Sequence, residues 1–461
     1  MKLKRICIIA LLVTTAASLT VWASGCPSRP DDDFEVDDES ELRENPVIEE
    51  GEDDPGISVP EFVKEGRNHI TLNGADWSSA VKALHNVKKN PFTIVHIGDS
   101  HLQADIATGT ARELFQYDYG NAGRGLVAPL RMTGTNEPSD YQFTSQYPWI
   151  PAKVMKTPWP HTMGFTGTSL RPSTKSSEIF VGTREDDDYN PFSSITLFHN
   201  GRINITGVKD RNGNAIAFSP KYSKDYTHID LTDEQTGVYV KFDTEGDLTL
   251  FGASLSGNRP GVFYHTIGNN GATYQTYNNI GTLGRGIAPL QPDVIILSLG
   301  TNEAFGHFDV GLFIAQVDKL VNNLKASNPG VPILIVTPME CQRSVYNTTS
   351  RKVRKPVKVP VKGKKGKKKY RTQTKTVTET KRVRSYGVNS NVAAVRNALL
   401  QYGRDNKIAV YDWYEIAGGA GASGKWLTDG LYGRDRVHHT SKGYRLQGYM
   451  LYRALSEALT K

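Results

Sequence analysis

A serine stands where an apolar run gives way to a helical pattern in the stretch IVHIGDSHLQAD, residues 94–105. The apolar run predicts a buried strand, and residues 103–116 predict a helix. Ser100 is therefore expected at the carboxyl end of a strand, where open α/β sheets bind their ligands. The amino terminus of the following helix favours negative charge that develops nearby. Most Gly-Asp-Ser tripeptides are turns capped by Asp and Ser, so the assignment depends on other residues.

Those residues lie in three further polar blocks. Asp435 and His438 stand three positions apart in DRVH, and one short loop can place both as the base and its orienting group for an activated serine. Gly271 in NNGA and Asn302 in GTNE each follow another predicted strand. The backbone N–H groups of Ser100 and Gly271 and the side-chain amide of Asn302 could donate hydrogen bonds to an oxyanion. The four blocks together predict acyl transfer through a serine nucleophile.

Short apolar runs and amphipathic helical patterns alternate around these blocks. Because the runs lack the polar–apolar alternation of a half-exposed sheet, they predict a parallel sheet covered by helices on both faces. The expected fold is α/β, a three-layer, flavodoxin-like domain. The predicted strands are residues 93–97, 261–267, 293–299, 332–336 and 408–413, and the predicted helices include residues 77–89, 309–325 and 444–459.

One segment lacks this alternation of strand and helix patterns. Roughly 125 residues, from 133 to 256, show no helical pattern, and this length is typical of a domain. They contain β-type runs (SSITLFHN, RINITGV, THIDLT, GVYVKF and DLTLFGASL) separated by turn residues such as Asn-Gly. The apolar content of the runs favours an inserted all-β module over a coreless system of loops.

A strongly basic segment follows the fourth predicted strand. Residues 351–384 contain sixteen basic residues and one acidic residue. Valine, then threonine, recurs at every second position on either side of KGKKGKKK, which predicts a β hairpin at residues 349–386. The lysines could simply protect the hairpin edges from aggregation. Alternatively, the run from Lys362 to Lys369 binds an acidic envelope polymer.

The amino terminus has the pattern of an export signal. Basic residues precede a short apolar run, and ASGC follows it. A cysteine after small residues resembles the lipobox of bacterial lipoproteins, which predicts Cys26 as an acylated N-terminus that anchors the protein to a membrane. An ordinary signal peptide with an incidental cysteine is the alternative. The predicted segments are a signal peptide (1–25), an acidic tether (26–60), a hydrolase domain in two parts (61–130 and 261–461) and the inserted β module (131–260).

The net charge of +7 hides two opposed blocks. Residues 31–54 contain fourteen acidic residues and one arginine, a composition that stays solvated, and the basic hairpin offsets them. The remainder of the chain is close to neutral. The charge balance therefore gives no reason to expect a nucleic-acid partner.

The four blocks resemble those of the SGNH (GDSL-type) hydrolases, in the family's order: IGDSH, NNGA, GTNE and DRVH. More narrowly, GDSHLQAD, SLGTNEAF and DRVHHTSKGY are similar to stretches of exported bacterial peptidoglycan O-acetylesterases, in which a carbohydrate-binding-like β module is also inserted after the first block. The resemblance implies Ser100 as nucleophile, His438 as base and Asp435 as the residue that orients it. It also implies that Ser100, Gly271 and Asn302 form the oxyanion hole.

Two features depart from the family pattern. His439 doubles the histidine where many relatives have an apolar residue or proline, and the basic hairpin has no counterpart in that pattern. Only His438 has the family's offset from the aspartate.

The sequence therefore predicts a serine esterase that removes O-acetyl groups from a cell-envelope polysaccharide, with peptidoglycan as the expected glycan. The alternatives are an O-acetyltransferase with the same residues, a polysaccharide-binding lipoprotein, and an esterase for another acetylated glycan or acyl ester. No cofactor and no metal are expected, because no His, Cys and carboxylate set has ligand spacing. The expected partners are the acetylated glycan and a membrane reached through the lipid anchor.

Overall fold

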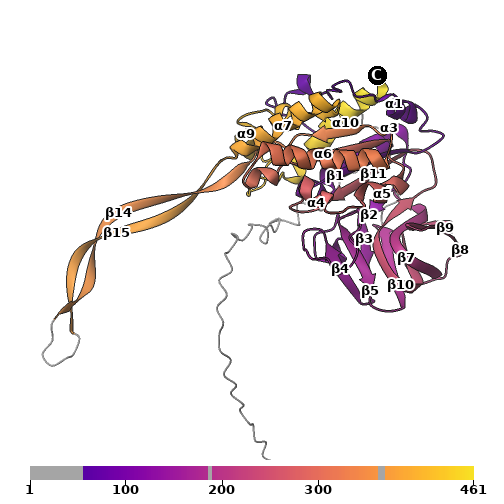
Figure 1. The fold of residues 1–461 in the computed structure, drawn as a ribbon, viewed down its shortest axis with the longest axis horizontal. Helices are drawn as coiled ribbons and strands as arrows, with labels where there is room; N and C mark the ends of the chain where they lie inside the picture. The colour runs from indigo at the N-terminus through magenta and orange to yellow at the C-terminus, as the bar shows by residue number, and fades with distance from the viewer. Residues whose placement is uncertain (1–55, 185–188, 362–368) are drawn as a thin grey trace, which may run out of the picture. The chain divides into compact units, whose positions relative to one another are not determined.

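The computed structural model describes residues 56–184, 189–361 and 369–461 (Figure 1). The predicted signal peptide, Cys26 and most of the acidic tether lie outside these residues, as do the hairpin lysines from Lys362 to Lys368. None of the described helices is both long and apolar enough to cross a membrane.

The described residues form a five-stranded parallel sheet in the order β11-β1-β12-β13-β16. In chain order this is 2-1-3-4-5, so the connections reverse direction beside β1, the point at which doubly wound sheets bind ligands. Each strand lies within two residues of a predicted one. The bounds are β1 Phe92–Gly98, β11 Val262–Gly268, β12 Val294–Ser298, β13 Ile333–Val336 and β16 Ala409–Tyr411.

Both faces of this sheet are covered, because successive strand side chains point to opposite faces. Val95 and Ile97 pack into a core with helices α4 to α7, whereas Phe92 and Ile94 pack into another with α1, α3 and α10. The predicted three-layer α/β fold is confirmed. The helices are α1 Ser78–His85, α2 Ser100–Gln103, α3 Ile106–Tyr119, α4 Tyr274–Asn278, α5 Leu283–Ile287, α6 Val310–Ser327, α7 Ser390–Asn406, α8 Trp413–Ile416, α9 Ala422–Thr428 and α10 Ser441–Thr460.

The helix predicted at residues 103–116 is two helices. α2 ends at Gln103 and α3 begins at Ile106, because Asp105 takes a left-handed backbone conformation with a φ of 57°. This break turns the chain just after Ser100 and leaves the Asp105 carboxylate pointing inward. The helix predicted at residues 77–89 is shorter than expected and ends at His85.

The β insertion is present between β1 and β11 as a nine-stranded sheet with its own apolar core (Figure 1). Every strand pair in it is antiparallel. Its strands are β2 Gly125–Val127, β3 Tyr141–Thr144, β4 Trp149–Lys153, β5 Thr168–Pro172, β6 Ser176–Thr183, β7 Phe192–Asp210, β8 Phe218–Tyr222, β9 Tyr226–Gln235 and β10 Gly237–Ser256.

The turn predicted at Asn200-Gly201 is wrong. β7 continues through it, and β10 likewise joins two runs that the sequence separates. Gly201 has a φ of 77° and lies so close to the Asp247 backbone that a Cβ would meet its carbonyl oxygen at 2.6 Å. The register of the β7–β10 pair shifts beside it, between Glu245 and Thr249. A β bulge uses the same residue types as a turn, so the sequence pattern could not separate the two.

The basic hairpin consists of β14 Gln342–Val361 and β15 Lys369–Val388, which pair in one register throughout (Figure 1). It is longer at its base than residues 349–386, because the strands begin pairing directly after Cys341. In the described chain these two strands pair only with each other.

Candidate active site

The loops after β1, β11 and β12 meet at one edge of the parallel sheet. Gly98 at the end of β1 lies beside Gly268 on one side and Ser298 on the other. The block GDS therefore lies between NNGA and GTNE. Gly98 has no room for a side chain, since a Cβ would lie 2.6 Å from the Leu102 side chain and 2.7 Å from the Ser298 carbonyl oxygen.

Ser100, His438 and Asp435 form a chain of hydrogen bonds. Ser100 Oγ lies 2.7 Å from His438 Nε2, and His438 Nδ1 lies 2.6 Å from Asp435 Oδ2. These contacts bring together residues 338 positions apart in the sequence. A hydroxyl, an imidazole and a carboxylate in this order form the arrangement that converts a serine into a nucleophile.

The DRVH loop holds Asp435 as an anion. The second carboxylate oxygen, Oδ1, accepts hydrogen bonds from the backbone N–H groups of Val437 and His438, at 2.9 and 3.0 Å. Burial acts to raise the pKa of Asp435, but the hydrogen bond from the His438 ring and these backbone bonds outweigh it and lower the pKa to about 2. The three-residue offset thus lets one carboxylate orient both the ring and the backbone of His438.

Two backbone N–H groups are available for an oxyanion. Ser100 is the first residue of α2, so its N–H has no partner within the helix. Gly271 has a φ of 76°, and the N–H groups that flank it are engaged by Gln103 and Asn269. Neither the Ser100 nor the Gly271 N–H donates a hydrogen bond to any residue in the described ranges.

The third expected oxyanion donor is engaged within the protein. Asn302 Nδ2 donates to the Ala272 carbonyl oxygen at 2.9 Å and to Asp99 Oδ2 at 3.3 Å. The bond to Ala272 fixes the Asn302 amide beside the Gly271 loop, whereas the bond to Asp99 is longer and therefore weaker. Burial raises the pKa of Asp99 to about 6, and its other oxygen caps α2 by accepting the His101 N–H at 3.0 Å. Asp99 thus braces the serine turn.

Two histidines lie beside the triad, His101 half-buried and His439 buried. The His101 ring packs against those of His438 and His439, with centroids 5.1 and 5.4 Å apart, and Tyr444 OH lies 3.2 Å from His101 Nδ1. Burial lowers the pKa of His101 well below its usual value and that of His439 to about 3. The His101 ring, which packs on His439, therefore supports one side of the His438 ring. The described residues contain no group of three or more His, Cys, Asp or Glu side chains that could hold a metal ion.

Gln103 connects these loops and was not singled out in the sequence. Its Oε1 accepts the Asn270 N–H at 2.7 Å, and its Nε2 donates to Thr135 Oγ1 at 2.7 Å and to the Asn136 carbonyl oxygen at 2.9 Å. The side chain fixes the backbone beside Gly271 and ties it to the segment that enters the β module. Its place in HLQAD, three residues after Ser100, is the only sequence signal for this role.

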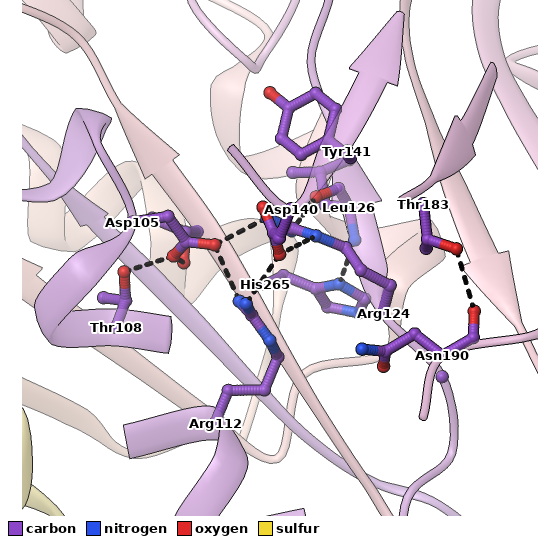
Figure 2. Close-up of polar contacts among 12 residues, drawn as sticks. Asp105, Thr108, Arg112, Arg124, Leu126, Asp140, Tyr141, Thr183, Asn190 and His265 are labelled. Carbon is purple, nitrogen blue, oxygen red and sulfur yellow. Dashed lines mark hydrogen bonds and ion pairs between the residues drawn. The ribbon is translucent and has the colours of Figure 1, made fainter. Parts of the chain in front are cut away.

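Two aspartates and two arginines form a buried ionic cluster (Figure 2). Asp105 Oδ2 contacts Arg112 Nη1 at 2.7 Å and Arg124 Nη2 at 2.6 Å, and Asp140 contacts both guanidinium groups at 2.9 Å. Burial acts to raise the pKa of Asp105, but the two arginines outweigh it and lower the pKa to about 2. The cluster also reaches β11, because Thr266 Oγ1 donates to Asp105 at 2.8 Å. It joins α3, the central sheet and the first strands of the insertion.

Comparisons with known proteins agree with this geometry. Residues 232–446 match the model of the GDSL-like Lipase/Acylhydrolase family, a range that includes the NNGA, GTNE and DRVH loops but begins after Ser100. No curated protein sequence matches the chain.

Among solved structures, a peptidoglycan O-acetylesterase shares the fold, with a TM-score of 0.63 and 20% identity over 85% of this chain and 99% of that one. A lipase/acylhydrolase from Enterococcus faecalis has a TM-score of 0.27 and a sequence identity of 14%, and the match covers 43% of this chain and 77% of that one. A family two carbohydrate esterase from Clostridium thermocellum has a TM-score of 0.28 and a sequence identity of 11%, and the match covers 69% of this chain and 99% of that one. The chain has the serine–histidine–aspartate geometry of a serine ester hydrolase, and its residues 232–446 are similar to the GDSL-like Lipase/Acylhydrolase family.

Proposed function

We propose that this protein removes O-linked acetyl groups from peptidoglycan. The observation that carries the proposal is the hydrogen-bonded chain Ser100–His438–Asp435 at the carboxyl edge of the sheet. It lies next to the backbone N–H groups of Ser100 and Gly271, which donate to no residue in the described ranges. The shared fold of a peptidoglycan O-acetylesterase, which matches over 99% of its own length, supports the choice of substrate.

In the first half of the reaction, Ser100 Oγ attacks the acetyl carbonyl carbon while His438 Nε2 accepts the hydroxyl proton. The carbonyl oxygen becomes an oxyanion that accepts hydrogen bonds from the N–H groups of Ser100 and Gly271. Asn302 supplies a third donor when the oxyanion takes the place of Asp99 in its longer, 3.3 Å bond. Such donors act because they are already oriented before charge develops.

Collapse of this intermediate breaks the ester bond, and the sugar hydroxyl leaves with the proton that His438 returns. Water then attacks the acetyl group on Ser100, with His438 again accepting a proton. Collapse of the second intermediate breaks the bond to Ser100 Oγ, His438 returns the proton to that oxygen, and acetate leaves. Asp435 stays ionised throughout and stabilises the imidazolium. The lowered pKa of the neighbouring His101 matters here, because a second cation at its place would oppose protonation of His438.

The test is acetate release from purified O-acetylated peptidoglycan. Ser100→Ala removes the attacking oxygen, so we expect release to fall by roughly 10⁴-fold while the thermal melting curve stays that of the wild type. Full activity in this variant would refute the assignment of the nucleophile. If the wild type hydrolyses a small acetyl ester but not acetylated peptidoglycan, the triad assignment survives and the proposed substrate does not.

We also propose that the protein is exported and held at a membrane through acyl chains on Cys26. The support is the ASGC block after the apolar run, since the residue itself lies outside the described ranges. In cells fed a labelled fatty acid, the wild type should incorporate label, and Cys26→Ala should lose both the label and membrane association. Label retained in Cys26→Ala would contradict this expectation.

A further inference from the structure

Both faces of the β14–β15 hairpin carry basic residues, but mainly valines lie among them on one face and mainly threonines on the other. Residues in even positions of β14 pair with residues in even positions of β15, so that all of them share one face, here called the even face. The only acidic residue of the two strands, Glu379, lies on the opposite face, where it forms an ion pair with Arg351 at 3.1 Å and another with Lys355. The even face carries basic residues and no acidic ones: Lys352, Arg354, Lys358, Arg382 and Arg384.

Hydroxyl groups alternate with these charges. The cross-strand partners of Lys352, Arg354 and Lys358 are Thr378, Thr376 and Thr372. Directly opposed residues on one face lie about 5 Å apart, within reach of one bound group. The even face therefore presents repeated pairs of a cation and a hydroxyl along an exposed ribbon. Because each cation lies opposite a threonine, none of these three is neutralised across the strands.

The even face continues into the loop that carries the triad aspartate. Arg436, the residue after Asp435, donates from Nη1 to Gln342 Oε1 at 2.9 Å, and its carbonyl oxygen accepts the Gln342 N–H at 2.9 Å. The Arg436 guanidinium also stacks on Tyr386 at 4.1 Å, and Arg384 stacks on the same ring at 5.0 Å. A row of cations thus leads from the hairpin to the active-site loop.

This composition fits a soluble polymer better than a lipid surface. Residues 342–388 contain no Leu, Ile, Met, Phe or Trp, the side chains with which interfacial segments enter lipid. Arginine guanidinium groups stack on the rings of Tyr386 and Tyr346, from Arg382 at 4.1 Å in the second case. Cations suit carboxylates, and the threonine hydroxyls suit the hydroxyl groups of sugars.

We propose that the even face binds a carboxylate-bearing polysaccharide and holds it against the active-site loop. The proposal rests on the esterase function only in that the bound polymer, or one linked to it, carries the ester that Ser100 cleaves. Binding itself needs no chemistry, so it can be measured in Ser100→Ala.

The test measures binding of fluorescent polygalacturonate to the full-length Ser100→Ala protein by anisotropy. In that background, K352Q/R354Q/K358Q removes three charges from the even face, and R371Q/K375Q/K381Q removes three from the opposite face as a matched control. We expect the first variant to weaken binding by about tenfold and the control to weaken it much less, with both melting curves unchanged. Raising the salt concentration should weaken the binding of polygalacturonate to Ser100→Ala. It should also reduce the difference in affinity between Ser100→Ala and the variant with the even face neutralised.

Several results would overturn the proposal. Equal losses in the two variants would mean that total charge, not the even face, is responsible. No loss in either would leave the lysines as protection of the hairpin edges. Tighter binding of polyphosphate or of anionic lipid vesicles than of polygalacturonate would identify a different partner. Failure of the esterase proposal would instead appear as absent acetate release with polygalacturonate binding intact, so the two failures are distinguishable.

Discussion

At the scale of single residues, the site depends on side chains whose partners are fixed by short loops. The offset between Asp435 and His438 was informative because a three-residue turn lets a carboxylate bind the ring and the backbone of the same histidine. Ser100 and Gly271 were expected from the ends of neighbouring strands, since the carboxyl ends of parallel strands meet at one edge. Their catalytic roles remain predictions until the variants are measured.

Asp435→Asn tests the orienting role. An amide keeps the size of the carboxylate, but its NH₂ group cannot accept the His438 Nδ1 proton, so the ring loses the tautomer that the reaction needs. We expect kcat to fall by roughly 10³-fold to 10⁴-fold. Hydrolysis of a small acetyl ester over pH 5 to 9 measures this loss, and a variant as active as the wild type would contradict the role.

The same variant has a signature in stability. The pKa of Asp435 is lowered from 3.8 to about 2 in the folded protein, so ionisation of this group stabilises the fold above pH 3.8 and that contribution is lost as the pH falls to about 2. The difference in unfolding free energy between the wild type and Asp435→Asn should therefore be constant above pH 3.8 and shrink as the pH falls below 3.8. Denaturant unfolding, followed by fluorescence at a series of pH values, measures this difference. A difference that does not change with pH would contradict the claim that ionisation of Asp435 stabilises the fold.

Other residues of the site gave little sequence signal. Gln103 and His101 act through neighbours from distant parts of the chain, Asn270 for the first and Tyr444 for the second. A glutamine or a histidine near a serine occurs in many unrelated turns. Their positions became informative only when the loops were placed together in three dimensions.

At the scale of elements, the strands of the parallel sheet were the most predictable part. Each is a short apolar run buried on both faces, a pattern that few other structures share. β7 and β10 were each predicted as separate shorter strands. Gly201 and Gly246 have positive φ values inside a bulged strand pair, and glycine in such a sequence is also typical of a turn. The ionic cluster could not be predicted, since its four charges come from α3 and from three separate places in the chain.

That cluster explains how an inserted β module can be held rigidly against a catalytic domain. Arg124 and Asp140 directly precede β2 and β3 of the insertion, whereas Asp105 lies in the break between α2 and α3 and Arg112 in α3. Two carboxylates and two guanidinium groups balance each other. Removal of one member would leave a buried charge without a partner, which typically costs about 3–5 kcal/mol.

At the scale of the whole molecule, the two parts of the catalytic domain and the insertion are expected to unfold together. Asn269, which follows β11, donates to the Thr166 carbonyl oxygen of the β insertion at 3.0 Å, and Gly167 lies so close that a Cβ would overlap the Asn269 amide. Together with the ionic cluster, these contacts place the oxyanion loop directly against the insertion. Neither part can loosen without exposing groups that the other keeps buried.

Scanning calorimetry tests this coupling. We expect a single transition for the wild type, and for Arg124→Met a single transition at a lower temperature, because the buried arginine links both parts and its loss destabilises them together. Arg202→Met is the matched control: its ion pair with Glu245 is 3.7 Å long and the two side chains are 85% and 70% exposed, so its loss should cost at most about 1 kcal/mol. Two transitions in the wild type, of which Arg124→Met shifts only one, would show that the insertion folds independently and that its contacts with the oxyanion loop do not couple the two parts.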